Sequence, residues 1–165
     1  MHETSSAPTP HRFLVILAAA IVLLPFSGCL DDDGGDDALT PTLLLSAPSL
    51  APRNDGTGEL HDATLSVNKV TPGESVVEWS DVKVTIKSAA GSVLLPLTSV
   101  REDTGTYGSD VEVWYSDTTG QRDRLDAGDA ILITGMEASE YEGGYVYVFL
   151  EDERVGDTVM PTDFP

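Results

Sequence analysis

Two patterns of hydrophobic and polar positions divide this chain. Residues 13–26 form an unbroken apolar run of 14 residues, which ends at Ser27 and Gly28. From about residue 60 onward, apolar and polar residues instead alternate with period two, as in strands that bury one face. The first pattern predicts an N-terminal apolar helix, and the second predicts an all-β domain without a long amphipathic helix.

The alternating part predicts about seven to eight short strands. Residues 145–150 are apolar on both faces, so we expect this strand at the centre of a sheet. Pro96 marks an edge strand or a strand end, and Trp79 is expected in the core where a strand begins. Loops over residues 99–110 and 120–129 are expected at the ends of the strands. Short strands separated by Gly, Pro, Asp and Ser turns favour an immunoglobulin-like β-sandwich.

The apolar run is too short to span a bilayer easily. At roughly 1.5 Å per residue it rises about 21 Å as a helix, against a hydrocarbon core of about 30 Å. A short apolar run closed by small residues is typical of a secretory signal, so residues 1–28 are predicted to be a signal peptide. The alternative is an uncleaved anchor over residues 13–30, at the low end of the length needed for a span.

Cys29 is the only cysteine of the chain and directly follows Ser27 and Gly28. This arrangement resembles the lipobox of envelope lipoproteins. The resemblance implies that Cys29 is lipidated and becomes the first residue of the mature protein. Because one acyl chain binds a membrane only marginally, stable anchoring needs two, which a diacylglyceryl group would supply. The protein is then extracytoplasmic, anchored to the outer face of the cell membrane.

The charge of the chain is strongly negative, with a formal net charge of −19 at pH 7. Five aspartates lie within residues 31–37, so residues 29–40 are expected to form a flexible acidic tether before a domain over residues 41–165.

The domain itself is also acidic, because from Ala38 onward the chain has 22 acidic and 8 basic residues, a net charge of −14. Such a surface repels nucleic acid, which we therefore exclude as a partner. The excess of Asp over Lys resembles the surfaces of salt-loving archaea, and an acidic mesophilic envelope protein is the alternative.

Three segments carry a second resemblance. Residues 79–86 (WSDVKVTI), 125–131 (LDAGDAI) and 143–148 (GGYVYV) together resemble the extracellular β-domain of archaeal type IV pilins and archaellin-like envelope proteins. The resemblance covers roughly residues 60–156 and implies a pilin-like β-sandwich. If cleavage occurs at Cys29, the helix is discarded and the domain sits on a lipid tether. If the helix is retained, the chain is instead a pilin-like filament subunit.

No catalytic constellation emerges from the sequence. After cleavage His61 is the only histidine, and a lone histidine without a second His or a Cys cannot form a zinc site. We therefore interpret His61 as a surface residue. No Gly-x-Ser-x-Gly elbow accompanies it, and Trp79 and Trp114 are expected to pack in the core or across strands rather than to line a sugar cleft.

The abundant reactive groups are carboxylates in Gly-containing loops. They are Asp103, Asp110, Asp123, Asp126 and Asp129. Calcium takes six to eight oxygen ligands, and such loops can supply them, but neither loop has the spacing of a known calcium loop. Solvated turn acids are the favoured interpretation, and bound calcium stays open.

These observations predict a non-catalytic lipoprotein that contacts an envelope protein or a polysaccharide. No cofactor, metal site or catalytic residue is assigned, and Cys29 is the one predicted modification site. The alternatives are a small-ligand or calcium-binding accessory module of a transporter or enzyme complex, and a filament subunit that keeps its N-terminal helix.

Overall fold

The computed structural model describes residues 40–53, 58–72, 76–121 and 123–165. Among these residues strands dominate, and the only helices are one short 3-10 turn, η1 (Trp79–Asp81), and one α-helical turn, α1 (Ala138–Tyr141). The prediction of an all-β fold is therefore confirmed. The predicted signal helix and Cys29 lie outside the described residues. Within the described ranges, no helix combines the length and the apolar character that a bilayer span needs.

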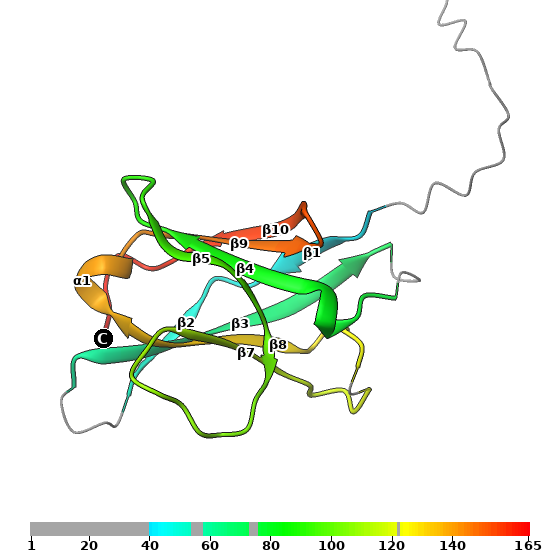
Figure 1. Ribbon diagram of the computed structural model, residues 1–165, viewed down its shortest axis with the longest axis horizontal. Helices are drawn as coiled ribbons and strands as arrows, with labels where there is room; N and C mark the ends of the chain where they lie inside the picture. Colours follow the sequence, from blue (N-terminus) through cyan, green and yellow to red (C-terminus); the bar gives the residue numbers. More distant parts are fainter. Residues whose placement is uncertain (1–39, 54–57, 73–75, 122) are drawn as a thin grey trace, which may run out of the picture. The chain divides into compact units, whose positions relative to one another are not determined.

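Ten strands are assigned within these ranges. They are β1 (Thr42–Leu45), β2 (Ser49–Pro52), β3 (Leu60–Thr71), β4 (Val82–Lys87), β5 (Val93–Ser99), β6 (Arg101–Glu102), β7 (Glu112–Ser116), β8 (Ala130–Glu137), β9 (Tyr145–Leu150) and β10 (Glu153–Val159). They form two sheets, one of six strands and one of four. In Figure 1 the four-stranded sheet lies above β2, β3, β7 and β8.

The six-stranded sheet is organised around the long strand β3. β8 pairs with one edge of β3, and β7 and then the two-residue strand β6 follow outward. β1 and β2 follow each other along the other edge, where β1 pairs with the C-terminal part of β3 and β2 with its N-terminal part. The break between them is fixed by Ser46, whose backbone N–H donates to the Ser66 carbonyl at 2.9 Å and whose Oγ accepts from the Ser66 N–H at 2.9 Å.

The four-stranded sheet has the order β10-β9-β4-β5. β9 is central, as predicted from its apolar residues on both faces, and β5 is an edge strand, as Pro96 indicates. β1 lies beside β10 at the other edge of this sheet. Gly156 of β10 eases this approach, because a Cβ there would lie 3.1 Å from the Leu43 carbonyl oxygen, a tight contact.

One hydrophobic core lies between the sheets. Its members alternate along the strands with polar or half-exposed residues, so the period-two pattern of the sequence is the pattern of burial. Leu65 and Ile133 of the larger sheet and Val84 and Ile86 of the smaller one are fully buried in the same cluster. Burying each such side chain is worth about 1.5–3 kcal/mol. The core contains no cysteine, so apolar packing is what holds the two sheets together.

Candidate functional site

The predicted modification site, Cys29, lies outside the described residues. The described residues all lie within one compact unit, Asp37–Pro165. The lipid-anchor prediction therefore rests on the sequence pattern, and the structure bears on the domain that would be anchored.

His61 is not a surface residue, so that interpretation is wrong. Only 5% of its surface is exposed. Its Nε2 lies 2.9 Å from the backbone oxygen of Pro165, and its ring makes an edge contact with Phe164 at a centroid distance of 5.2 Å. The sequence did not reveal this because the contact joins positions more than 100 residues apart. His61 therefore joins β3 to the end of the described chain through Phe164 and Pro165.

The three aspartates of the 120–129 loop do not converge on one point. Asp129 is fully buried and accepts hydrogen bonds from the backbone N–H of Thr118 at 3.0 Å and of Asp126 at 2.7 Å. The Asp126 carboxylate instead pairs with Arg124 Nε at 3.0 Å. These carboxylates hold the loop in shape, as acceptors of backbone N–H groups and as an ion-pair partner.

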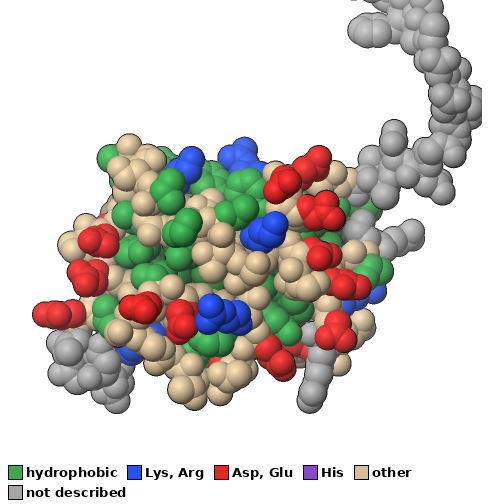
Figure 2. Space-filling view, viewed as in Figure 1, with side chains coloured by type: hydrophobic (Ala, Val, Ile, Leu, Met, Phe, Trp, Pro, Cys, Tyr) green, Lys and Arg blue, Asp and Glu red, His purple; other side chains and the backbone are tan. Residues whose placement is uncertain are grey.

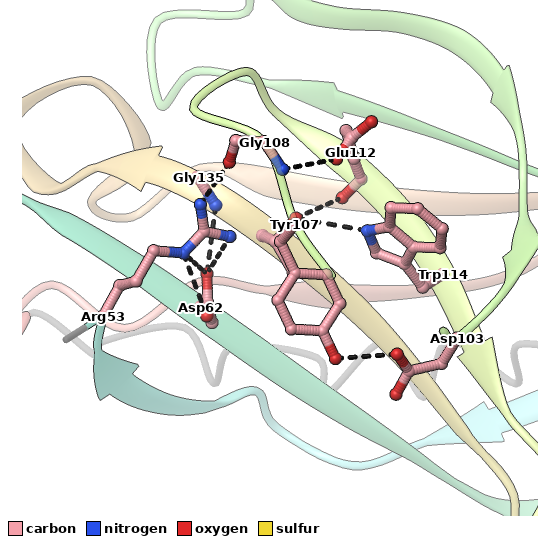
Figure 3. A network of polar contacts seen from close by, with 9 residues as sticks. Arg53, Asp62, Asp103, Tyr107, Gly108, Glu112, Trp114 and Gly135 are labelled. Atoms are coloured by element: carbon pink, nitrogen blue, oxygen red, sulfur yellow. Dashed lines mark hydrogen bonds and ion pairs between the residues drawn. The ribbon is translucent and has the colours of Figure 1, made fainter. Parts of the chain in front are cut away.

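The most connected polar cluster lies on the outer side of the six-stranded sheet (Figure 3). Arg53 follows β2, and its Nη2 lies 2.9 Å from Oδ1 of Asp62 on β3. That carboxylate oxygen also accepts from the Gly135 N–H at 3.1 Å. Arg53 Nη1 donates to the Gly108 carbonyl oxygen. Both charged side chains are mostly buried, 13% and 21% exposed, so removing either one leaves the other without its partner in a desolvated site.

Tyr107 brings a second set of contacts to this cluster. Its hydroxyl donates to Asp103 Oδ1 at 2.7 Å, and its ring lies 5.7 Å from the guanidinium of Arg53 and 5.7 Å from the ring of Trp114. Burial, together with the hydrogen bond from Tyr107 to Asp103, raises the pKa of Tyr107 to about 12. Trp114 faces away from the core and is still only 7% exposed, and its Nε1 donates to Thr134 Oγ1 at 3.3 Å.

The loop between β6 and β7 (residues 103–111) is therefore fixed across the outer side of the larger sheet. The sequence predicts a loop over residues 99–110 at the ends of the strands. Part of that range is instead strand β6, and residues 103–111 contact the larger sheet through Tyr107 and Gly108. Sequence reasoning missed Arg53, Asp62 and Tyr107 as a cluster. One signal was available, because Tyr107 is the only aromatic residue in the mostly polar segment 103–111, and a large ring needs a surface to pack on.

Two hollows among the described residues share Tyr115 in their lining. One has a volume of about 360 Å³ and is lined by Glu102, Asp103, Tyr115, Ser116, Asp117 and Gly120. The other has about 260 Å³ and is lined by Glu78, Trp79, Ser80, Val100, Tyr115 and Asp123. Burial first, and then Glu102, Asp123 and Asp117, raise the pKa of Tyr115. The hollows therefore suit cationic groups or hydroxyl donors and disfavour anions.

Trp79 packs beneath Tyr115, the residue that both hollows share. It is 2% exposed, as expected for a tryptophan at the start of a strand, and its ring stacks on Tyr115 at 4.5 Å with an angle of 10°.

The described residues contain no group of three or more His, Cys, Asp or Glu side chains placed to hold a metal ion. Comparisons of the chain with known protein families, curated proteins and solved structures found no match.

Proposed function

We propose that this chain is a non-catalytic, lipid-anchored protein of the outer face of the cell membrane, whose β-domain makes contacts with other envelope components. The observation that carries the proposal is the order of elements at the N-terminus. An apolar run, two small residues and the only cysteine precede a run of aspartates. A lipid on Cys29 would leave the acidic segment as a spacer between the membrane and the domain.

The finer architecture that we infer is an immunoglobulin-like β-sandwich. Support comes from the strand orders, because β1-β3-β8-β7 and β10-β9-β4-β5 correspond to the A-B-E-D and G-F-C-C′ sheets of that fold. A buried Trp79 just before β4 and a buried Tyr141 before β9 also match features of that fold. Because a fold does not by itself imply a function, the function must be argued from particular sites on the domain.

A contact role is also supported by what the polar groups already do. The Arg53–Asp62 pair, Asp129 and Asp103 are engaged in bonds that fix loops. These side chains therefore stabilise the fold through an ion pair and through hydrogen bonds to the backbone of the loops. The remaining outer faces of the domain are then available for contact with a partner.

The anchor is tested by the mature N-terminus. Mass spectrometry of the protein isolated from membranes is expected to find a chain that begins at Cys29 with the added mass of a diacylglyceryl group. Cys29→Ser is expected to abolish both cleavage and lipid labelling. Ser27→Thr serves as the control, because it keeps the cysteine and a small neighbouring residue.

The same measurement separates the alternatives. A mature chain that retains residues 13–26 and is found in filaments would establish the filament-subunit alternative and contradict the lipid anchor. An unmodified chain that begins at Met1 and washes freely from membranes would contradict every form of the proposal.

A second candidate function is a small-ligand or calcium-binding accessory module. The specific observation in its favour is the pair of acid-lined hollows around Tyr115. Isothermal calorimetry with calcium and with neutral and amino sugars is the test. Binding that is lost in Asp117→Asn and kept in Asp157→Asn would favour this role, whereas the absence of heat at millimolar ligand would exclude it.

A further inference from the structure

The outer face of the four-stranded sheet presents its side chains in ordered rows. Along β4 and β9 every second residue is buried in the core, so the residues between them point outward. The strand register places the outward residues side by side across the sheet. The first row is Val159, Tyr145, Lys87 and Val93, and a row at the other end is Arg154, Phe149, Lys83 and Ser99.

Exposed apolar side chains gather on this sheet. Of the six large hydrophobic residues that are exposed in the described part of the chain, four belong to its strands. They are Val93 at 59%, Val159 at 50%, Leu97 at 46% and Tyr145 at 41%. Single exposed hydrophobic residues need no explanation, but a group on one face of a sheet marks an interaction surface.

The same face carries Lys83 and Lys87, which have no carboxylate partner among the described residues. All four described arginines are paired with Asp or Glu. No described carboxylate lies within ion-pair distance of Lys83 or Lys87, although the chain holds 28 acidic residues. Lys87 Nζ instead lies 5.6 Å from the ring centre of Tyr147. In Figure 2, Lys and Arg side chains lie at the upper side of the domain, with Asp and Glu side chains beside them toward the right; in Figure 1 this is the side of the four-stranded sheet.

We propose that this face binds a second copy of the same chain, through a two-fold axis that runs parallel to the strands between β9 and β4. Such an axis places β9 of one copy opposite β4 of the other, and β10 opposite β5. In the first row, Tyr145 then meets Lys87 of the second copy, and Val159 meets Val93. In the last row, Phe149 meets Lys83. In these two rows Tyr145 and Phe149 each gain a cation, and Val159 and Val93 gain each other as aliphatic partners. The two end rows of the face are therefore complementary to themselves, and in the row between them Tyr147 meets Thr85.

The size and charge of the face define the strength of this contact. Four strands at about 4.8 Å and six residues at about 3.3 Å give a patch of roughly 20 Å by 20 Å. This is below the roughly 800 Å² per partner of a stable complex, so the dimer is weak and depends on concentration. Two copies of charge −19 also repel each other. Because salt screens that repulsion more than it weakens apolar and cation–π contacts, the dimer is favoured by salt.

The geometry is tested by cross-linking in the full chain in mild detergent. The single cysteine is removed by Cys29→Ser, and Val93→Cys and Val159→Cys are made in separate chains. A short bismaleimide is expected to join a mixture of the two chains several-fold more than either chain alone. The reason is that residue 93 of one copy lies opposite residue 159 of the other, whereas two copies of residue 93 lie at opposite edges of the interface.

A charge variant and its matched control complete the test. Lys87→Glu in both chains is expected to reduce the cross-linked fraction to that of the single chains, while Lys69→Glu, with the same charge change on β3, leaves it unchanged. Raising salt from low to molar concentration is expected to increase the yield of cross-linked dimer.

Equal yields in all combinations of chains, or equal yields in Lys87→Glu and the parent, would overturn the proposal. So would a chain that stays monomeric and binds polygalacturonate through Lys87, since the partner would then be an anionic polymer. Because every chain lacks Cys29, this result is independent of the lipid anchor.

Discussion

Gly135 shows how one residue without a side chain holds two segments together. Its φ is +77°, and a Cβ at this position would lie 2.5 Å from the Asp110 carbonyl oxygen. Its N–H donates to Asp62, so the β6–β7 loop, β8 and β3 meet at this residue. The close approach of the loop backbone is possible only because the side chain is missing.

Gly135→Ala is expected to destabilise the domain by about 3 kcal/mol, because backbone strain and a backbone clash add. Gly91→Ala is the control. Gly91 has a φ of +88° with no atom within 4 Å of the added Cβ, so its loss should be only the conformational cost of about 1 kcal/mol. Urea unfolding of both variants gives the difference. Equal losses would show that the loop moves away from Gly135 without cost.

Tyr107 links the stability of the domain to alkaline pH. Its pKa is raised from 10.0 to about 12, first by burial and then by Asp103. A raised pKa means that the native state favours the neutral phenol. The corresponding stability is fully present below pH 10 and is lost as the pH rises toward 12.

We therefore expect the free energy of unfolding of the parent protein to fall more steeply between pH 10 and 12 than that of Tyr107→Phe. Asp103→Asn should lower the pKa of Tyr107, which tyrosinate absorbance would detect. Asp157→Asn on β10 is the control that should leave the titration unchanged. A Tyr107→Phe profile that matches the parent over this range would contradict the assignment.

At the scale of elements, the β6–β7 loop acts as a cover over Trp114. Tyr107 packs against Trp114 and Arg53 holds the loop carbonyl at Gly108, so the loop is fixed at two points. Tyr107→Ala removes one of them. Hydrogen exchange of residues 103–111 is then expected to accelerate at least several-fold, while exchange in β3 and β8 stays protected. Tyr145→Ala on the other sheet should not change exchange in the loop.

The strands were largely predictable, because burial on one face imposes period two on the sequence. The central position of β9 and the edge position of β5 followed from apolar residues on both faces and from Pro96. The sequence did not predict β2, because Pro52 and the following polar residues are typical of a loop. It also did not predict the contacts of Arg53, Asp62 and His61. These depend on which strands pair, and a local pattern carries no information about that pairing.

At the scale of the whole molecule, charge is the dominant asymmetry. Four ion pairs are present among the described residues, and exposed pairs contribute only about 0.2–1 kcal/mol each. From Ala38 onward, 22 acidic residues face 8 basic residues. Unpaired carboxylates therefore outnumber paired ones, and repulsion between them opposes the folded state more than the pairs support it.

This balance predicts the sign of the salt effect on stability. Raising salt from about 0.1 M to 1 M shortens the Debye length from about 10 Å to 3 Å, which removes more repulsion than attraction. The free energy of unfolding, measured by urea titration, is therefore expected to rise with KCl. The double variant Glu151→Gln, Asp152→Asn removes two adjacent exposed acids at the β9–β10 turn, so it should be more stable than the parent at low salt and gain less from KCl. A stability that falls with KCl would mean that attraction within the ion pairs outweighs the carboxylate repulsion. The acidic surface would then be no adaptation to salt.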